Sequence, residues 1–75
     1  MDASRKGNYA DAVQWYQKAA EQGSSIAQER LGFMYYNGYG VTKDITQAIY
    51  WYKKAAAQDD AIAINALKGL GVSYP

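Results

Sequence analysis

The stretch Ala12-Val-Gln-Trp-Tyr-Gln-Lys-Ala-Ala-Glu-Gln22 returns later in the chain as Ala48-Ile-Tyr-Trp-Tyr-Lys-Lys-Ala-Ala-Ala-Gln58. Trp15 and Trp51 fix the displacement at 36 residues. A sequence that resembles itself at a spacing of roughly 20–50 residues is typical of repeat folds, whose units are too small to bury their apolar faces alone and therefore stack on their neighbours. The self-similarity predicts an array of stacked repeats.

Length and composition are those of a small globular chain. It has 75 residues, of which 49% are hydrophobic and 15% aromatic, which is unlike a disordered segment. A chain of this size buries only about 60% of the surface that its unfolded form exposes, so the core is small. The chain also has no cysteine, and therefore no disulfide to stabilise that core.

The distribution of charged and apolar residues argues against two classes of partner. Lys and Arg number 8 and Asp and Glu 7, for a formal charge of +1, and no basic run occurs. Because nucleic-acid affinity comes mostly from clustered Lys and Arg, we expect no nucleic-acid partner. No stretch approaches the roughly 20 apolar residues of a membrane span, so we expect no membrane insertion. Met1 to Gly7 also lacks the apolar core of a signal peptide, and no compartment is indicated.

Capping signals predict the first and third of four helices. Asp44 and Gln47 have capping-box spacing, which predicts a helix over 45–58. Its apolar stripe consists of Ile45, Ala48, Ile49, Tyr52, Ala55 and Ala56. By the same spacing, Asn8 is predicted to cap a helix over 9–22 that ends at Gly23. Its stripe consists of Tyr9, Ala12, Val13, Tyr16, Ala19 and Ala20.

Serines, glycines and aspartates mark the other two helices. Ser24 or Ser25 can cap a helix that continues to Asn37, and Ser25 has capping-box spacing with Gln28. The segment Gly38-Tyr-Gly40 is predicted to break this helix and form a loop turn, not a phosphate cradle. Asp59 and Asp60 are predicted to start a last helix that runs towards Tyr74.

These residues resemble the Sel1-like repeat of the tetratricopeptide superfamily. The motif comprises Leu31-Gly32-x-x-Tyr35, Gly38-x-Gly40-Val41, Asp44, Ala48 and Trp51-Tyr52-x-Lys54-Ala55-Ala56. The resemblance implies an all-α fold, a short α-solenoid of antiparallel helix pairs with four helices. We predict a single domain over 1–75 with one complete repeat at about 25–60 and partial repeats on either side. Residues 7–12 look more like the shorter tetratricopeptide turn, which would make Met1 to Lys6 the stub of a preceding helix.

Two registers are open for the last helix. An offset of 36 pairs Ile62, Ala63 and Leu67 with Ile26, Ala27 and Leu31. An offset of 39 pairs Ala66, Leu70, Gly71 and Tyr74 with Ala27, Leu31, Gly32 and Tyr35, and restores the glycine and tyrosine of the motif. The two differ by nearly one helical turn, so they present nearly the same face.

Most recurring residues have a structural interpretation. We expect the paired alanines to let antiparallel helices approach closely, and Gly32 to mark a point of close packing where another backbone crosses the helix. The aromatic residues expected to pack in the core are Trp15, Tyr16, Trp51 and Tyr52.

Residues for catalysis are scarce. Without His or Cys, the usual catalytic triads and zinc sites cannot form. Asp59 and Asp60 are adjacent, so on a helix their carboxylates point apart and do not share a proton or metal. We therefore expect no enzymatic activity, no catalytic residue, no metal site and no cofactor.

The resemblance implies a function in protein interaction. It implies that the helices carrying the Leu-Gly-x-x-Tyr motif line a concave groove, with the Trp-Tyr helices outside. The groove candidates for binding a peptide or protein partner are Ile26, Glu29, Phe33, Tyr36 and Asn37. The alternative is a structural module that forms a homo-oligomer through its exposed end helices.

Overall fold

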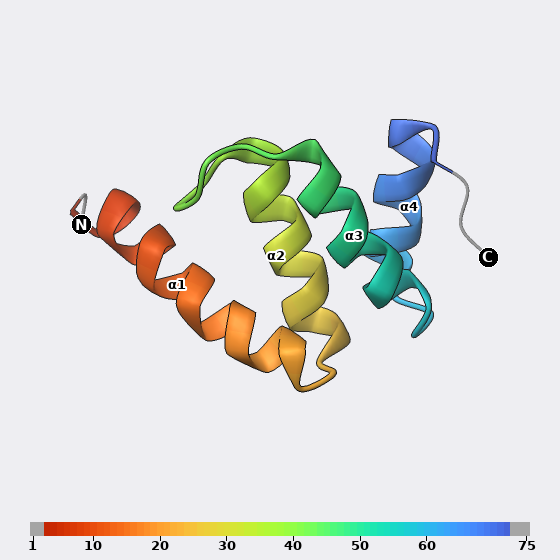
Figure 1. The fold of residues 1–75 in the computed structure, drawn as a ribbon, viewed down its shortest axis with the longest axis horizontal. Coiled ribbons are helices and arrows are strands. Elements are labelled where there is room, and N and C mark those ends of the chain that lie inside the picture. The colour runs from red at the N-terminus through yellow and green to blue at the C-terminus, as the bar shows by residue number, and fades with distance from the viewer. Residues whose placement is uncertain (1–2, 73–75) are drawn as a thin grey trace.

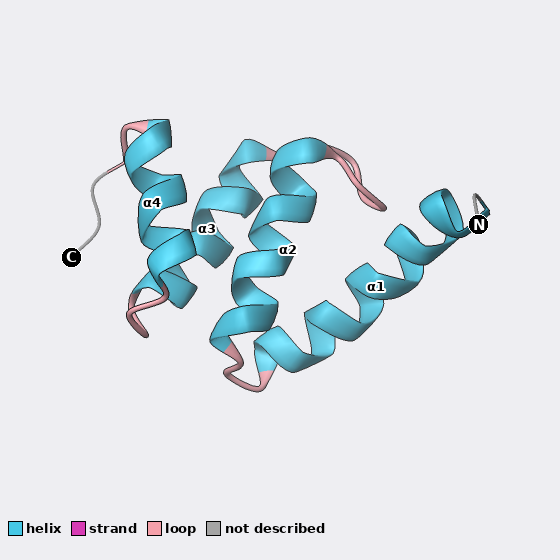
Figure 2. Ribbon diagram, turned by 180° about the vertical axis from the view of Figure 1, so that it is seen from behind, coloured by secondary structure: helices cyan, strands magenta, loops and turns pink. Residues whose placement is uncertain are grey.

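The computed structural model describes residues 3–72, and these form four α-helices with no strand among them (Figures 1 and 2). The helices are α1 (Ala3–Glu21), α2 (Ser25–Asn37), α3 (Ile45–Ala56) and α4 (Ala61–Leu70). Each helix packs against the next along the chain and runs in the opposite direction (Figure 1). The predicted all-α array of antiparallel helices is confirmed.

The first helix begins earlier than predicted. Helix α1 runs without interruption from Ala3 through Gly7 and Asn8 to Glu21. The predicted start at Asn8 and the separate stub over 1–6 are therefore wrong, while Met1 and Asp2 lie outside the described residues. A glycine inside a helix costs only about 1 kcal/mol relative to alanine, which one turn of additional helix can offset.

Three polar side chains cap the helices that follow. Ser24, Asp44 and Asp60 each accept a hydrogen bond from the backbone N–H three residues later, at 3.1–3.2 Å. Ser24 is thus the cap of α2, and the capping box predicted from Ser25 is wrong. In a capping box, the Gln47 side chain would accept a hydrogen bond from the backbone N–H of Asp44. That N–H instead donates to the carbonyl of Tyr35 in α2, at 2.9 Å.

The caps also decide the register of the last helix. Asp60 takes the place of Ser24, 36 residues earlier, and Asp59 takes the place of Gly23 with a left-handed φ of 67°. Asp59 therefore precedes α4 and does not belong to its start. Gly71, with a φ of 74°, ends α4 after Leu70, whereas the 39-residue register places Gly71 inside the helix, so that register is wrong. The predicted pairing of Tyr74 lies outside the described residues. Helix α3 likewise ends at Ala56, two residues before its predicted end.

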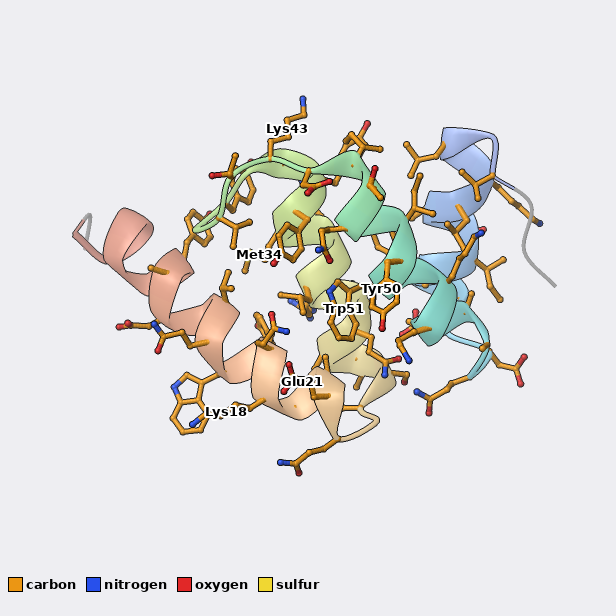
Figure 3. All side chains as sticks on the ribbon, in the orientation of Figure 1. Lys18, Glu21, Met34, Lys43, Tyr50 and Trp51 are labelled. Carbon is orange, nitrogen blue, oxygen red and sulfur yellow. The ribbon has the colours of Figure 1, made fainter. Side chains whose placement is uncertain are left out.

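The core consists of two clusters, one on each side of α3. The first joins α1, α2 and Trp51 of α3, and its buried members are Val13, Ala20, Ala27, Leu31, Met34 and Trp51. Met34 and Trp51 are labelled in Figure 3. The second joins α3 and α4, and its buried members are Ala48, Tyr52, Ala55, Ala56, Ala63 and Leu67. A Cβ on Gly32 would lie 3.0 Å from the ring of Tyr52, so the close packing predicted there is confirmed, although the group that crosses is a side chain and not a backbone.

The repeated tryptophans have opposite environments. Trp51 is 6% exposed, as predicted, whereas Trp15 is 73% exposed and the prediction that it packs in the core is wrong. Trp51 lies against the preceding helix pair, but among residues 3–72 no helix covers the corresponding side of α1. Tyr50, whose counterpart in α1 is the polar Gln14, is 50% exposed and lies on the outside of α3.

Candidate functional site

A cavity of about 350 Å³ opens between α2 and α4. Its floor comes from α3 and its two walls from helices that belong to successive repeats. The lining residues are Phe33, Tyr36, Asn37, Tyr52, Ala66, Gly69 and Leu70. The cavity thus lies on the side of the array that the resemblance assigned to a groove.

Helical spacing explains how α2 presents its wall. Phe33, Tyr36 and Asn37 are three and four residues apart, which places them on one face of the helix. Gly32, one residue before Phe33, lets the ring of Tyr52 approach closely enough to form the cavity floor. The α4 wall has no side chain at Gly69, where a Cβ would meet no atom within 4 Å.

Three polar side chains, those of Tyr36, Asn37 and Tyr52, line this mostly apolar cavity. Burial, together with the nearby Glu29 and Tyr36, raises the pKa of Tyr52 to about 12, so its hydroxyl stays protonated at neutral pH. The side-chain amide nitrogen of Asn37 donates to the carbonyl of Phe33 at 2.9 Å. This bond orients the amide, and its oxygen is still able to accept a hydrogen bond from a ligand.

Glu29 lies beside the cavity but does not line it. The side chain is buried, and desolvation raises the pKa of its carboxyl group. The Asp60 carboxylate raises this pKa further, and Arg30 lowers it; the Arg30 Nε lies 3.8 Å from Glu29 Oε2. Two acidic side chains, Glu29 of α2 and Asp60 at the start of α4, therefore lie near the N-terminal ends of the two walls.

The structure divides the five predicted groove residues. Phe33, Tyr36 and Asn37 line the cavity, while Ile26, at 62% exposure, and Glu29 do not. The sequence reasoning missed Tyr52 and the α4 residues. Tyr52 was assigned to the core, where it also belongs, and the α4 wall could be found only once the register of the last helix was known.

A row of aromatic rings connects this site to α1. The ring of Phe33 meets Tyr39 edge to face at 5.7 Å between centroids, and Tyr39 stacks on Tyr9 at 4.8 Å. Gly40 has a φ of 75°, and a Cβ there would lie 2.5 Å from the carbonyl oxygen of Tyr9. The segment Gly38-Tyr-Gly40 is a loop, as predicted, and it packs against α1.

The site can bind a ligand by burying its apolar surface and by forming hydrogen bonds with it. Over residues 3–72, no three His, Cys, Asp or Glu side chains are close enough together to hold a metal ion. In the same part of the chain, none of the helices has both the length and the apolar character needed to span a membrane.

Comparison with known proteins supports the resemblance seen in the motif. A family model described as Sel1 repeat matches residues 3–24 and 25–60. Among solved structures, the chain is similar to a Sel1 repeat protein from Oxalobacter formigenes, with 42% sequence identity and a TM-score of 0.76. The similarity covers 88% of this chain but 29% of that one, so this chain spans less than a third of the length of that protein. No curated protein matches the sequence.

Proposed function

The chain belongs to the Sel1 repeat family, and we propose that it is an adaptor module that binds a peptide segment of a protein partner in the cavity between α2 and α4. Sel1 repeats are generally protein-interaction modules of a helical scaffold type, and this type is generally non-enzymatic. Within the array, we take residues 25–60 as the complete repeat and assign binding to the place where it meets α4.

The cavity itself is the observation that carries this proposal. Its volume of about 350 Å³ lies in the range of ligand pockets, and it is lined mainly by apolar atoms. Phe33 and Tyr36 are 45% and 40% exposed, so each has ring surface that a partner can cover. Large aromatic side chains of this kind supply much of the binding free energy in protein interfaces.

The lining indicates what the ligand should carry. An apolar side chain fits between Tyr36 and Leu70, where it would bury carbon against both walls. The Asn37 amide oxygen can accept from a peptide N–H, and the Tyr52 hydroxyl can donate to a carbonyl. Towards Glu29 and Asp60, a basic or neutral residue is preferred over an acidic one.

Ile26 and Glu29 are secondary candidates. Both lie in the N-terminal part of α2, outside the cavity lining. They would contact only a peptide long enough to continue along α2 in that direction.

Binding measurements on matched variants test the proposal. A peptide selected against the wild-type chain should lose about 1–2 kcal/mol of binding free energy on Tyr36→Ala, because that change removes a cavity wall. Tyr50→Ala, which removes an exposed ring from the opposite side of α3, should leave binding unchanged, as should Lys54→Ala. A peptide that survives Tyr36→Ala but is lost with Tyr50→Ala would place the binding surface on the outside of the array.

A further inference from the structure

The 36-residue repeat allows each position of α1 to be compared with its counterpart in α3. Four core-facing positions are more exposed in α1 than in α3. Trp15 is 73% exposed where Trp51 is 6% exposed. The other three positions, half-buried in α1 and buried in α3, are Ala12 and Ala48, Tyr16 and Tyr52, and Ala19 and Ala55. Within residues 3–72, the helix pair that covers these positions in α3 has no counterpart beside α1.

The opposite end of the array shows the complementary difference. Trp51 packs on a surface of α1 and α2 that includes Val13. The counterpart of Val13 is Ile49, and that of the buried Gln28 in α2 is Ile64 in α4. Ile49 and Ile64 are both only half-buried, although both are more apolar than the residues that they replace. The α3–α4 end therefore carries apolar surface where the α1–α2 pair is covered by α3.

We propose that the chain self-associates head to tail. Helix α1 of one copy packs on α3 and α4 of the next copy, in the same way that α3 packs on α1 and α2 within one chain. Trp15 then occupies the place on Ile49 and Ile64 that Trp51 occupies on the preceding pair. The contact continues an interface that already exists inside the chain, built from the same repeated residues. It leaves the cavity aromatics Phe33 and Tyr36 free, so it is independent of the proposed peptide site.

A polar contact at the repeat boundary fits the same arrangement. Within the chain, the Gln58 amide donates to the carbonyl of Gly23 at 2.9 Å and to Oε1 of Gln28 at 3.1 Å. Gln22 is the counterpart of Gln58, and Asp59 is the counterpart of Gly23. In the head-to-tail contact, the Gln22 amide meets the Asp59 carbonyl of the neighbouring copy.

Besides the loss of the Gln28 acceptor, which Ile64 replaces, one further difference should make the contact between copies weaker than the corresponding contact within the chain. Lys68 stands where Gly32 stands in α2, and Gly32 is the residue that lets the Tyr52 ring approach. Tyr16, the counterpart of Tyr52, therefore meets a lysine side chain instead of bare backbone. Association should be concentration-dependent, and Lys68→Ala should shift it to lower concentration.

The geometry predicts a particular form of association. The two contacting surfaces differ, so the interface is heterologous and each added copy presents a new free end. The mass should therefore grow through a series of species with concentration and should not stop at a dimer.

Sedimentation of the 75-residue chain over a wide concentration range tests this. We expect the wild type to show rising mass, Trp15→Ala to stay monomeric and Tyr50→Ala to behave as wild type. Since Trp15 is already exposed, its loss should not unfold the chain. A wild type that is monomeric throughout, or association that survives Trp15→Ala, would overturn the proposal.

Mixing two variants separates this arrangement from a symmetric one. Ile64→Lys disables the α3–α4 end and Trp15→Ala the α1 end, so each variant alone should be monomeric. An equimolar mixture should form a heterodimer and grow no further, because one intact interface remains. If Ile64→Lys is unfolded by circular dichroism, Ile49→Lys replaces it. Association of the folded Ile64→Lys or Ile49→Lys variant alone, as expected for pairing of two α1 helices or exchange of α4, would overturn the head-to-tail contact.

Discussion

The ring of Tyr52 lies across Gly32, at 3.0 Å from the position that a Cβ on this glycine would occupy. This crossing brings α3 close to α2 and places the ring of Tyr52 at the floor of the cavity. A single absent side chain therefore sets both the packing of the complete repeat and the depth of its candidate binding site.

Two glycine substitutions should have opposite effects for this reason. Gly32→Ala should destabilise the chain despite the higher helix propensity of alanine, because overpacking costs about 1–3 kcal/mol and the Tyr52 ring has to move. Gly69→Ala, where the new Cβ meets no atom within 4 Å, should stabilise by about 0.5–1 kcal/mol. Urea unfolding of both variants measures the difference. Changes of equal size and direction in the free energy of unfolding would contradict the close contact between Tyr52 and Gly32.

The two tryptophans provide a second matched pair. Trp51→Ala should lower the free energy of unfolding by about 3–5 kcal/mol, because it leaves a cavity in the cluster that joins α1, α2 and α3. Trp15→Ala should change it by no more than about 0.5 kcal/mol, since that ring is exposed. Circular dichroism melts at low protein concentration distinguish them. A loss of comparable size at both positions would mean that Trp15 is also packed in the folded monomer.

Glu29 should make stability depend on pH. Burial, and then the Asp60 carboxylate, raise the pKa of Glu29 in the folded chain above its ordinary value of 4.5. The folded state then binds the proton more tightly than the unfolded state, so the contribution of Glu29 to stability is fully present below pH 4.5 and is lost as the pH rises through the raised pKa.

Glu29→Gln stays neutral and should avoid this loss. The variant should melt at a higher temperature than the wild type at neutral pH, and the advantage should disappear as the pH falls below 4.5. Glu21→Gln, at an exposed position, is the matched control for the removal of one carboxylate. Melting curves for wild type and Glu29→Gln that coincide at every pH would contradict the assigned environment of Glu29.

The repeat made much of the fold predictable, because local signals agreed with it. The Trp-Tyr segment that recurs after 36 residues indicated the repeat, and Gly38 and Asp44 predicted the end of α2 and the start of α3. The prediction for Trp15 was wrong for a physical reason: identical local sequences were assigned identical environments, yet burial depends on which helix lies opposite. The start of α1 was missed because Gly7 and Asn8 weaken a helix without ending it.

The candidate site was predicted on one side only. Phe33, Tyr36 and Asn37 follow from their place in the motif, and the structure puts all three on the cavity. The facing wall depends on the register of α4, which Asp60 and Gly71 fix through backbone conformation rather than through the motif. Glu29 and Ile26 share α2 with the lining residues but do not line the cavity.

The most direct test of peptide binding between α2 and α4 is an amide chemical-shift titration of the wild-type chain with a peptide selected against it. The account predicts that the largest shifts occur at Tyr36, Asn37 and Gly69, on both walls of the cavity at once. Shifts confined to the exposed side of α3, around Tyr50 and Lys54, with the cavity residues unchanged, would contradict it.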